Sequence, residues 1–279
     1  MAGLIINDAH LLECTDGSVA VVQMDCTKNT AKFTPGMPDT VVLHYTAGRS
    51  AESSARYLAK PNVKASAHLV IGKSGEVYQL VPFDTIAWHA GKSSYKGRHG
   101  YNKFSIGIEI DNAGPLTKSG NQYMTWFGDS RQPEEVVEAR HRNEAKDRYW
   151  ERYTKAQIDR VEQICELLFE KYPAMDSILG HEEIAPGRKQ DPGPAFPLDK
   201  IRNLLMFDDR TLEETNEYPF EGVVVPDSLN IREAPGMNAA LAAQPLPKGS
   251  KVQVIGKVEN WYRVTTEVEG WVAKEFIQL

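Results

Sequence analysis

Histidine and carboxylate side chains are the residues of this chain that are best suited to metal chemistry. Among the seven histidines, His44 stands inside an apolar run, where a buried imidazole needs a polar partner. His181 precedes Asp191 by ten positions, and a Pro- and Gly-rich loop joins them. Two imidazoles and one carboxylate that converged would form a three-ligand zinc site with a fourth position left for water. The pattern is not the His-Glu-x-x-His of common metalloproteases, because position 185 is Ala.

Glu109 lies in a short run whose residue pattern predicts a β-strand. From Ser105 to Ile110 isoleucine occupies every second position, so the opposite face carries Ser105, Gly107 and Glu109. A carboxylate in such a run is an unusual structural choice, and a general acid-base role is one interpretation. A salt-bridged strand residue is the alternative.

Strands interleaved with helices must position these residues. The run from Thr40 to Thr46, which contains His44, has the β-branched and aromatic content of a buried strand. Thr154 and Gln157 form a capping box, which predicts an amphipathic helix ending near Tyr172. The other predicted elements are a helix at 51–59, a hairpin joining strands at 68–71 and 76–81, and a helix from about 197. This order predicts an α/β fold with a mixed central β-sheet flanked by helices.

Six segments that appear in order along the chain add a family resemblance. They are Val-Val-Leu-His-Tyr-Thr-Ala-Gly (41–48), Ser-Ala-His-Leu-Val-Ile (66–71), Gly-Glu-Val-Tyr-Gln-Leu-Val-Pro (75–82), Ala-Trp-His-Ala-Gly-Lys-Ser (87–93), Asn-Lys-Phe-Ser-Ile-Gly-Ile-Glu-Ile (102–110) and Gly-His-Glu-Glu-Ile-Ala-Pro-Gly-Arg-Lys-Gln-Asp-Pro-Gly-Pro-Ala-Phe (180–196). Together they resemble the type-2 N-acetylmuramoyl-L-alanine amidases over residues 38–206. That family includes cytosolic anhydromuropeptide amidases, phage and autolytic wall amidases, and peptidoglycan recognition proteins.

The resemblance implies a role for five residues. His44, His181 and Asp191 match the family's Zn²⁺ ligands, Glu109 matches its catalytic glutamate, and Lys189 matches the lysine that stabilises the reacting carbonyl. The chemistry of these residue types agrees, because zinc lowers the pKa of bound water to about 7 and a nearby carboxylate can then move a proton. Lys189 would place positive charge near the developing oxyanion. The competing interpretation is that its side chain, or that of Arg188, faces solvent.

Substrate contacts are also expected near this site. Trp88 and His89 belong to a family motif beside the substrate groove, and His68 matches a recurrent histidine next to the site. Core packing is the alternative for Trp88, and a supporting or core position is the alternative for His68. Tyr95 and Asn102 lie in the loop before the Glu109 strand and are further candidates for substrate binding.

The chain is expected to divide into two domains. Residues 1–206 would form the zinc amidase domain, with a loosely structured lead-in at 1–37 and an aromatic-rich insertion at 112–153 that packs as a flap or helix. An acidic linker at 207–221 follows. Residues 222–279 switch to short β-type runs, and their Leu-Asn-Ile-Arg and Gly-Trp-Val stretches resemble a bacterial SH3-type domain. Such domains either bind cell-wall peptide or dock on the catalytic domain, so Trp261 and Trp271 are candidates for a recognition surface or for the barrel core.

Composition and charge argue against several partners. The net charge is -6 without a basic stripe, so nucleic acid is not an expected partner. No apolar run approaches the roughly 20 residues that span a membrane. The opening residues lack a basic start and are interrupted by Asp8, so no secretory signal is expected. The expected location is the cytoplasm, or the cell wall if the chain is a phage endolysin or leaves by a non-standard route.

The function that these patterns favour is zinc-dependent hydrolysis of the lactyl-amide bond between N-acetylmuramic acid (MurNAc) and L-alanine in peptidoglycan or muropeptides. The alternatives are a peptidoglycan-binding protein without catalysis and a zinc peptidase that cuts within the stem peptide. Binding proteins tend to lack a metal ligand or the catalytic carboxylate, whereas here all four matching residues are present.

Overall fold

The computed structural model describes residues 3–206, 220–236, 239–258, 261–266, 270–273 and 277–278. The chain divides into two compact units, Met1–Leu198 and Asp199–Leu279, each with its own core. Most of the expected linker at 207–221 lies outside the described residues, except that Phe220 and Glu221 begin a strand. None of the helices in the described ranges combines the length and the apolar character that a membrane crossing requires.

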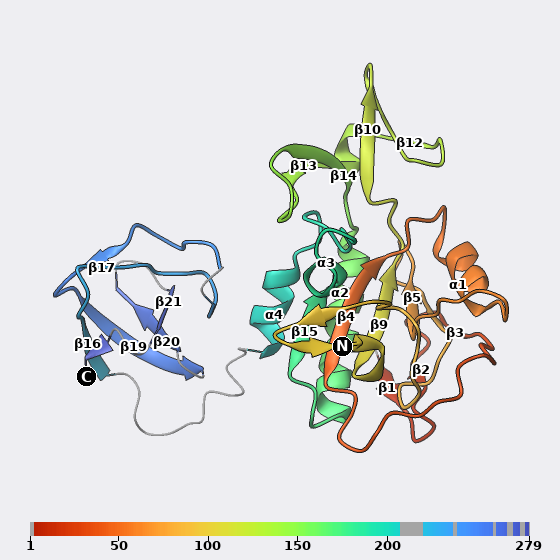
Figure 1. Cartoon of the computed structure of the whole chain (residues 1–279), viewed down its shortest axis with the longest axis horizontal. Helices are drawn as coiled ribbons and strands as arrows, with labels where there is room; N and C mark the ends of the chain where they lie inside the picture. Colours follow the sequence, from red (N-terminus) through yellow and green to blue (C-terminus); the bar gives the residue numbers. More distant parts are fainter. Residues whose placement is uncertain are drawn as a thin grey trace. The chain divides into compact units, whose positions relative to one another are not determined.

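A six-stranded mixed sheet forms the centre of the first unit, in the order β15-β4-β9-β5-β6-β3 (Figure 1). Its strands are β3 (Val21–Gln23), β4 (Thr40–Tyr45), β5 (Leu69–Ile71), β6 (Val77–Gln79), β9 (Ser105–Ile110) and β15 (Ser177–Gly180). The four strands β15, β4, β9 and β5 are parallel, β6 is antiparallel to β5, and β3 is parallel to β6. The predicted α/β class with a mixed central sheet is therefore confirmed.

The strand register decides which residues can meet on one face of this sheet. His44 on β4 pairs with Glu109 on β9, and Glu109 pairs with Val70 on β5. Residues directly opposite in a parallel pair share a face, so His44, Glu109 and Val70 lie side by side. The isoleucines of β9 are fully buried on the other face, as the alternation predicts.

Three helices accompany the sheet in the described part of the first unit, and two of them follow clear start signals. Helix α1 (Ala51–Ala59) begins at Ser50, whose side chain accepts from the backbone N–H of Ser53, and its Ala51 and Ala55 pack with Val70. Helix α2 (Lys155–Lys171) has the predicted capping box at Thr154 and Gln157 and lies behind the sheet in Figure 1. The third is α3 (His181–Ile184), and α4 (Leu198–Met206) begins where the second unit starts.

The residues before β4 are more ordered than the expected lead-in. The strands β1 (Leu4–Ile6) and β2 (Leu12–Cys14) form an antiparallel pair, and β3 becomes an edge strand of the central sheet. Between β6 and β9 the chain forms three short elements, which are β7 (Ser94–Tyr95), β8 (Arg98–His99) and η1 (Tyr101–Lys103). These parts of the chain were not predicted because their elements are only two or three residues long.

The insertion at 112–153 folds as a second sheet rather than as a helix. Its order is β12-β11-β10-β14-β13, and it stands above the central sheet in Figure 1. The elements are β10 (Pro115–Ser119), β11 (Gln122–Met124), β12 (Ser130–Arg131), η2 (Pro133–Glu135), β13 (Val136–Arg140) and β14 (Asp147–Glu151). Its aromatics supply a small core, because Tyr123, Phe127 and Tyr149 pack against Leu116 and Val136. The large aromatic residues therefore correctly indicated an ordered segment, but the β-propensity of its residues did not reveal the strands.

The second unit contains a five-stranded antiparallel sheet in the order β21-β20-β19-β16-β22. The strands of this sheet are β16 (Phe220–Val224), β19 (Lys251–Val258), β20 (Trp261–Thr265), β21 (Gly270–Ala273) and β22 (Ile277–Gln278). A separate antiparallel pair is formed by β17 (Ser228–Leu229) and β18 (Leu246–Pro247). Alternate residues such as Val252, Val254 and Val264 form its core, as expected of a small barrel. Trp261 is half-buried, and the side chain of Trp271 lies outside the described residues.

Candidate metal centre and active site

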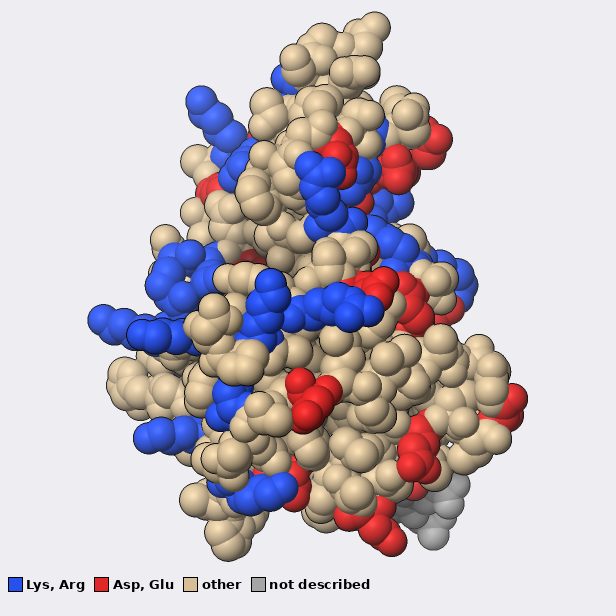
Figure 2. All heavy atoms as spheres, turned by 90° about the vertical axis from the view of Figure 1, so that its right-hand side faces the viewer, with Lys and Arg blue, Asp and Glu red and all other residues tan. Residues whose placement is uncertain are grey.

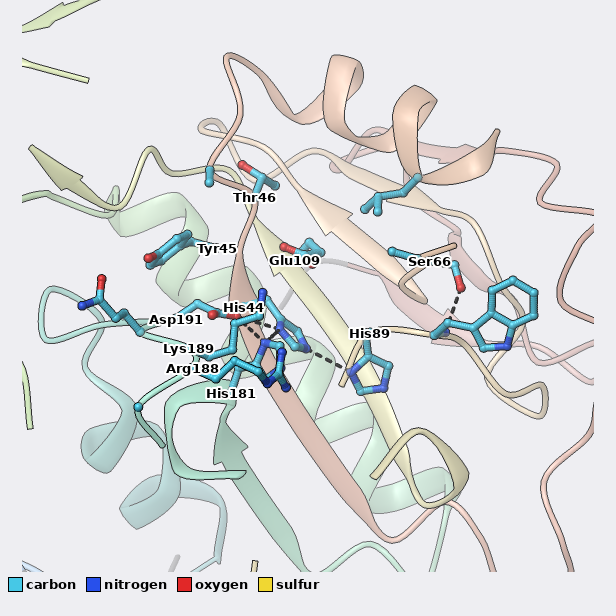
Figure 3. Close-up of a pocket in the computed structure, with 16 residues that line it drawn as sticks. His44, Tyr45, Thr46, Ser66, His89, Glu109, His181, Arg188, Lys189 and Asp191 are labelled. Atoms are coloured by element: carbon cyan, nitrogen blue, oxygen red, sulfur yellow. Dashed lines mark hydrogen bonds and ion pairs between the residues drawn. The ribbon is translucent and has the colours of Figure 1, made fainter. Parts of the chain in front are cut away.

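Three side chains from separate parts of the sequence converge on one point. The Nδ1 atoms of His44 and His181 lie 2.9 Å apart, and each lies 2.8 Å from Oδ2 of Asp191. All three residues are buried. Figure 3 shows them pointing toward one another from β4, from α3 and from the loop that follows α3. Within the described residues this is the group of His, Cys, Asp and Glu side chains able to hold a metal ion.

The far sides of both imidazoles are already hydrogen-bonded. His181 Nε2 lies 3.1 Å from the carbonyl of Ala90, and His44 Nε2 lies 3.0 Å from Nδ1 of His89. His89 Nε2 in turn lies 3.2 Å from the carbonyl of Ser105. Because carbonyls only accept, this network assigns the proton of each ring to Nε2 and leaves the Nδ1 lone pairs of His44 and His181 directed at Asp191. Two lone pairs and a carboxylate that face one another are a donor set for a cation.

The pKa shifts favour the same protonation states. Burial and the neighbouring His181 ring lower the pKa of His44 to about 4, although Asp191 opposes this shift. Burial works to raise the pKa of Asp191, but the close contacts with the His181 and His44 rings outweigh it and hold that pKa well below its ordinary value. At neutral pH the site therefore presents a neutral His44 and an ionised Asp191, which are the forms that bind a metal.

Gly107 explains how His89 reaches His44. Gly107 lies on the same sheet face as His44 and Glu109. A Cβ at position 107 would lie only 2.2 Å from Cγ of the His89 ring. Glycine therefore leaves the space in which this imidazole lies against the sheet.

Glu109 lies next to the three donor residues and faces the same pocket. Its Oε2 is buried and has no hydrogen-bond partner. Burial, and secondarily the Asp191 carboxylate, raise the pKa of Glu109 well above its ordinary value, while Lys189 opposes the shift. A buried acceptor without a partner is costly in a folded protein, so its presence points to a group held ready for a ligand.

The pocket has a volume of about 400 Å³ and contains most of the predicted site residues. Those lining it are His44, Trp88, His89, Glu109, His181, Lys189 and Asp191. Other lining residues, to which the sequence analysis gave no role, are Tyr45, Thr46, Ala47, Leu58, Ala65, Ser66, Gly187, Arg188 and Gln190. Most of these residues lie within a few positions of a predicted ligand in the sequence, and that proximity is the only feature from which a place in the pocket could have been predicted. Leu58 and Ala65 carried no comparable signal.

Three predicted substrate contacts are not brought to this pocket. His68 is fully buried, because its Nδ1 accepts from the N–H of Gly107 and its Nε2 lies 2.8 Å from the carbonyl of Thr85. The side-chain oxygen of Asn102 accepts from the N–H groups of His89 and Ala90, so Asn102 orders the His89 segment. Tyr95 packs against a buried cluster away from the lining. None of the three residues therefore lines this pocket, and their contact with substrate stays a prediction.

Comparison with known proteins gives the family. Residues 34–194 match the N-acetylmuramoyl-L-alanine amidase family, and residues 227–278 match the bacterial SH3 domain. The 1,6-anhydro-N-acetylmuramyl-L-alanine amidase AmpD of Salmonella typhimurium is 36% identical over 145 residues, which is 52% of this chain and 59% of the relative. The N-acetylmuramoyl-L-alanine amidase AmiD of Escherichia coli is 30% identical over 170 residues, covering 58% of this chain and 51% of the relative. The chain thus spans little more than half the length of these curated relatives.

Two solved structures are also similar. A crystal structure of a selenomethionine derivative of AmpD matches with a TM-score of 0.47 and 27% identity, covering 72% of this chain and 99% of that one. The complex of E. coli AmiD with anhydro-N-acetylmuramic acid-L-Ala-D-gamma-Glu-L-Lys matches with a TM-score of 0.45 and 25% identity, covering 72% and 65%. Because the family match at 34–194 takes in more than half of the sequence, this chain belongs to the N-acetylmuramoyl-L-alanine amidase family and carries a C-terminal bacterial SH3 domain.

Proposed function

We propose that this protein is a zinc-dependent N-acetylmuramoyl-L-alanine amidase that hydrolyses the bond between the lactyl group of MurNAc and L-alanine. The observation that carries the proposal is the convergence of His44, His181 and Asp191 beside the unpartnered Glu109, in one pocket of a chain from this family. The named relatives act on this class of bond.

His44, His181 and Asp191 would hold the zinc ion. Two neutral imidazoles and a carboxylate match the preferences of zinc, and three protein ligands are typical of catalytic rather than structural zinc sites. When bound, zinc acts as a Lewis acid and lowers the pKa of water to about 7. The chain's own contribution is to keep Nδ1 of each imidazole free, through the bonds of His44 to His89 and of His181 to Ala90.

Glu109 would handle the proton. During hydrolysis a water oxygen bonds to the lactyl carbonyl carbon, the carbon–nitrogen bond breaks, and the amine nitrogen of L-alanine gains a proton. The raised pKa of Glu109 suits a group that accepts the proton of the attacking water and then gives it to the leaving amine near neutral pH. Its free Oε2 is the atom that would do so.

Lys189 would stabilise the charge that develops on the carbonyl oxygen. It lines the same pocket, and its positive charge acts on both Glu109 and His44. A fixed cation beside a developing oxyanion lowers the barrier because it needs no reorganisation during the reaction. In Figure 3 Lys189 and Arg188 lie beside the three donor residues.

The test is an assay of purified muropeptides with the full chain, with and without chelator. We expect release of free peptide that begins at L-alanine, loss of release on chelation and recovery with zinc. Glu109→Gln should abolish release while zinc content stays unchanged. Cleavage within the stem peptide would instead identify a peptidase, and zinc-loaded protein that binds muropeptide without cleaving it would identify a binding protein. Either result would overturn the proposal.

The C-terminal SH3 domain would bring the enzyme to its substrate. Bacterial SH3 domains are of a cell-wall-binding type, so we propose cell-wall peptide as the ligand of residues 222–279. Co-sedimentation with purified walls should retain the full chain and should fail for a chain that ends at residue 221. Equal retention of both would contradict this part of the proposal.

A further inference from the structure

The insertion at 112–153 contacts the rim of the pocket at two separate places. The first contact joins the turn after β11 to the loop after β4. The indole Nε1 of Trp126 donates to the carbonyl of Ala47 at 2.9 Å. Arg49 forms an ion pair with Asp129 at 3.1 Å and donates to the carbonyl of Phe127 at 2.7 Å. Because Ala47 lines the pocket, this turn is fixed directly at the pocket edge.

The second contact joins the turn after β13 to the segment that carries two of the three donor residues. His141 is buried and lies 2.7 Å from the carboxylate of Glu182, the residue after His181. The same carboxylate accepts from the N–H of Gly193 at 3.2 Å. Gln190, which lines the pocket, donates to Glu144. The insertion is therefore held by contacts at two separate places on the rim of the pocket.

Trp126 is a strongly exposed aromatic residue at this rim. Its side chain is 73% exposed although it is a large apolar ring. Its polar atom is already used by Ala47, and its orientation is further fixed by an edge contact with Phe127, with ring centroids 5.4 Å apart. Ala47 itself has a φ of 48°, a strained conformation for a residue with a Cβ. The strained backbone of Ala47 and the fixed, solvent-exposed ring of Trp126 lie together at the edge of the pocket, and this combination indicates a binding surface.

The chemistry left on Trp126 favours a sugar ring. With the N–H occupied, the exposed part of the indole offers an apolar π face and no hydrogen bond to a peptide group. A cationic side chain of a stem peptide is disfavoured, because the carboxylate of Asp129 in the same turn is already paired with Arg49. Arg49 itself lies over the ring of Phe127, the ring neighbour of Trp126. Figure 2 shows Lys and Arg side chains gathered across the middle of the face that carries α1, below the insertion. The C–H face of a pyranose ring is neutral and flat, and it suits such an indole.

We propose that Trp126 is a stacking surface for a saccharide ring of the glycan part of the substrate, supplied by the insertion and added to the pocket edge at Ala47. This inference rests on the proposed amidase function, since that function makes the ligand a glycan-linked peptide. His44 and Ala47 are three residues apart, a chain span of at most about 11 Å, so a substrate held at the donor residues can reach the rim.

The test compares two ligands on the full, zinc-loaded chain in the Glu109→Gln background, in which binding is measured without turnover. One ligand is N-acetylglucosaminyl-MurNAc-tetrapeptide, and the other is a lactyl-L-alanyl peptide of the same sequence without sugar. Trp126→Ala should raise the Kd of the sugar-bearing ligand roughly three- to tenfold, the scale of one lost ring contact, and leave the Kd of the sugar-free ligand unchanged. Trp126→Phe keeps a ring and should give an intermediate Kd for the sugar-bearing ligand.

A matched control is Tyr57→Ala, which removes another exposed aromatic ring, on α1, and should change neither Kd. An unchanged Kd for the sugar-bearing ligand in Trp126→Ala would overturn the proposal, and so would an equal loss for both ligands. Failure of the proposed amidase function is recognised separately, because the chain with Glu109 intact would then not hydrolyse muropeptide, whereas the binding comparison does not depend on hydrolysis.

Discussion

Replacement of Glu109 by Gln should abolish turnover and at the same time stabilise the metal-free fold. The Oε2 atom of Glu109 is buried without a partner, and desolvating such an acceptor costs about 1–3 kcal/mol, or more when it is charged. Glutamine needs neither a buried charge nor a retained proton but leaves an unpaired amide, so a gain of about 1 kcal/mol is expected at neutral pH. For a unit of 198 residues this corresponds to a rise in Tm of about 2–4 °C.

The pH dependence of this gain follows from the direction of the pKa shift. Burial raises the pKa of Glu109 well above its ordinary value, so the folded chain retains this proton at pH values where the unfolded chain has lost it. Between the two pKa values the folded state binds more protons, and the stability of the wild type therefore falls as the pH rises. Below about pH 4 the group is protonated in both states and contributes nothing. The glutamine side chain of the variant does not titrate, so the advantage of the variant should be absent near pH 4, grow as the pH rises, and become constant above the raised pKa.

The assay is thermal unfolding of the chelated protein from about pH 4.5 to about pH 8, a range chosen to begin near the ordinary carboxyl pKa. Glu134→Gln is the control because Glu134 is exposed. In parallel, turnover of muropeptide by the zinc-loaded variant should fall by about 10²–10⁴-fold, with zinc content unchanged. A difference in Tm that does not vary with pH, or a wild type that is more stable than the variant at the alkaline end, would refute the argument that Glu109 is an uncompensated buried carboxylate.

Three further predictions concern the surroundings of the metal centre. His89→Ala should weaken zinc affinity by about 10–100-fold in a chelator competition, because His44 loses the partner of its Nε2. Gly107→Ala should also weaken zinc affinity, because a Cβ at this position would displace the His89 ring. Unchanged zinc affinity in both variants would show that His89 does not support the metal site. Lys189→Ala should lower kcat by about 10²–10³-fold without changing zinc content, and a change confined to KM would contradict a role in charge stabilisation. Addition of zinc at about 100 times its Kd to the metal-free chain should raise the free energy of unfolding by about 2.7 kcal/mol, measured as a rise in Tm. The His44→Ala variant should show no such rise in Tm.

The sequence was informative where a residue's role depends on local patterning. The alternation of β9 placed Glu109 opposite its isoleucines, and the β-branched run at 40–46 placed His44 in a buried strand. The capping box at Thr154 located the start of α2. Short-range periodicity and end signals decide such elements, and they are visible in a single chain.

The roles of the remaining histidines depend on contacts that no local pattern contains. His68 and His89 both lie in family-like motifs, yet His68 is enclosed by Gly107 and Thr85 while His89 is bonded to His44. The difference arises from which strand pairs with which, over sequence separations of 17 to 45 residues. Residue type alone does not distinguish one histidine from another. The roles of His68 and His89 could therefore be assigned only from the order of the strands in the sheet.

The insertion shows the same limit for a whole segment and gives it a consequence for function. Its strands are two to five residues long, too short for a periodic signal, and its sheet is stabilised by contacts between Tyr123 and Tyr149 and between Leu116 and Val136. Once formed, it contacts the loop after β4 through Trp126, α3 through His141, and the segment after α3 through Glu144. Those segments carry or adjoin the donor residues, so a change in the insertion would act on ligand geometry and on the pocket rim together. We therefore expect that variation in this segment changes substrate preference while His44, His181, Asp191 and Glu109 stay the same.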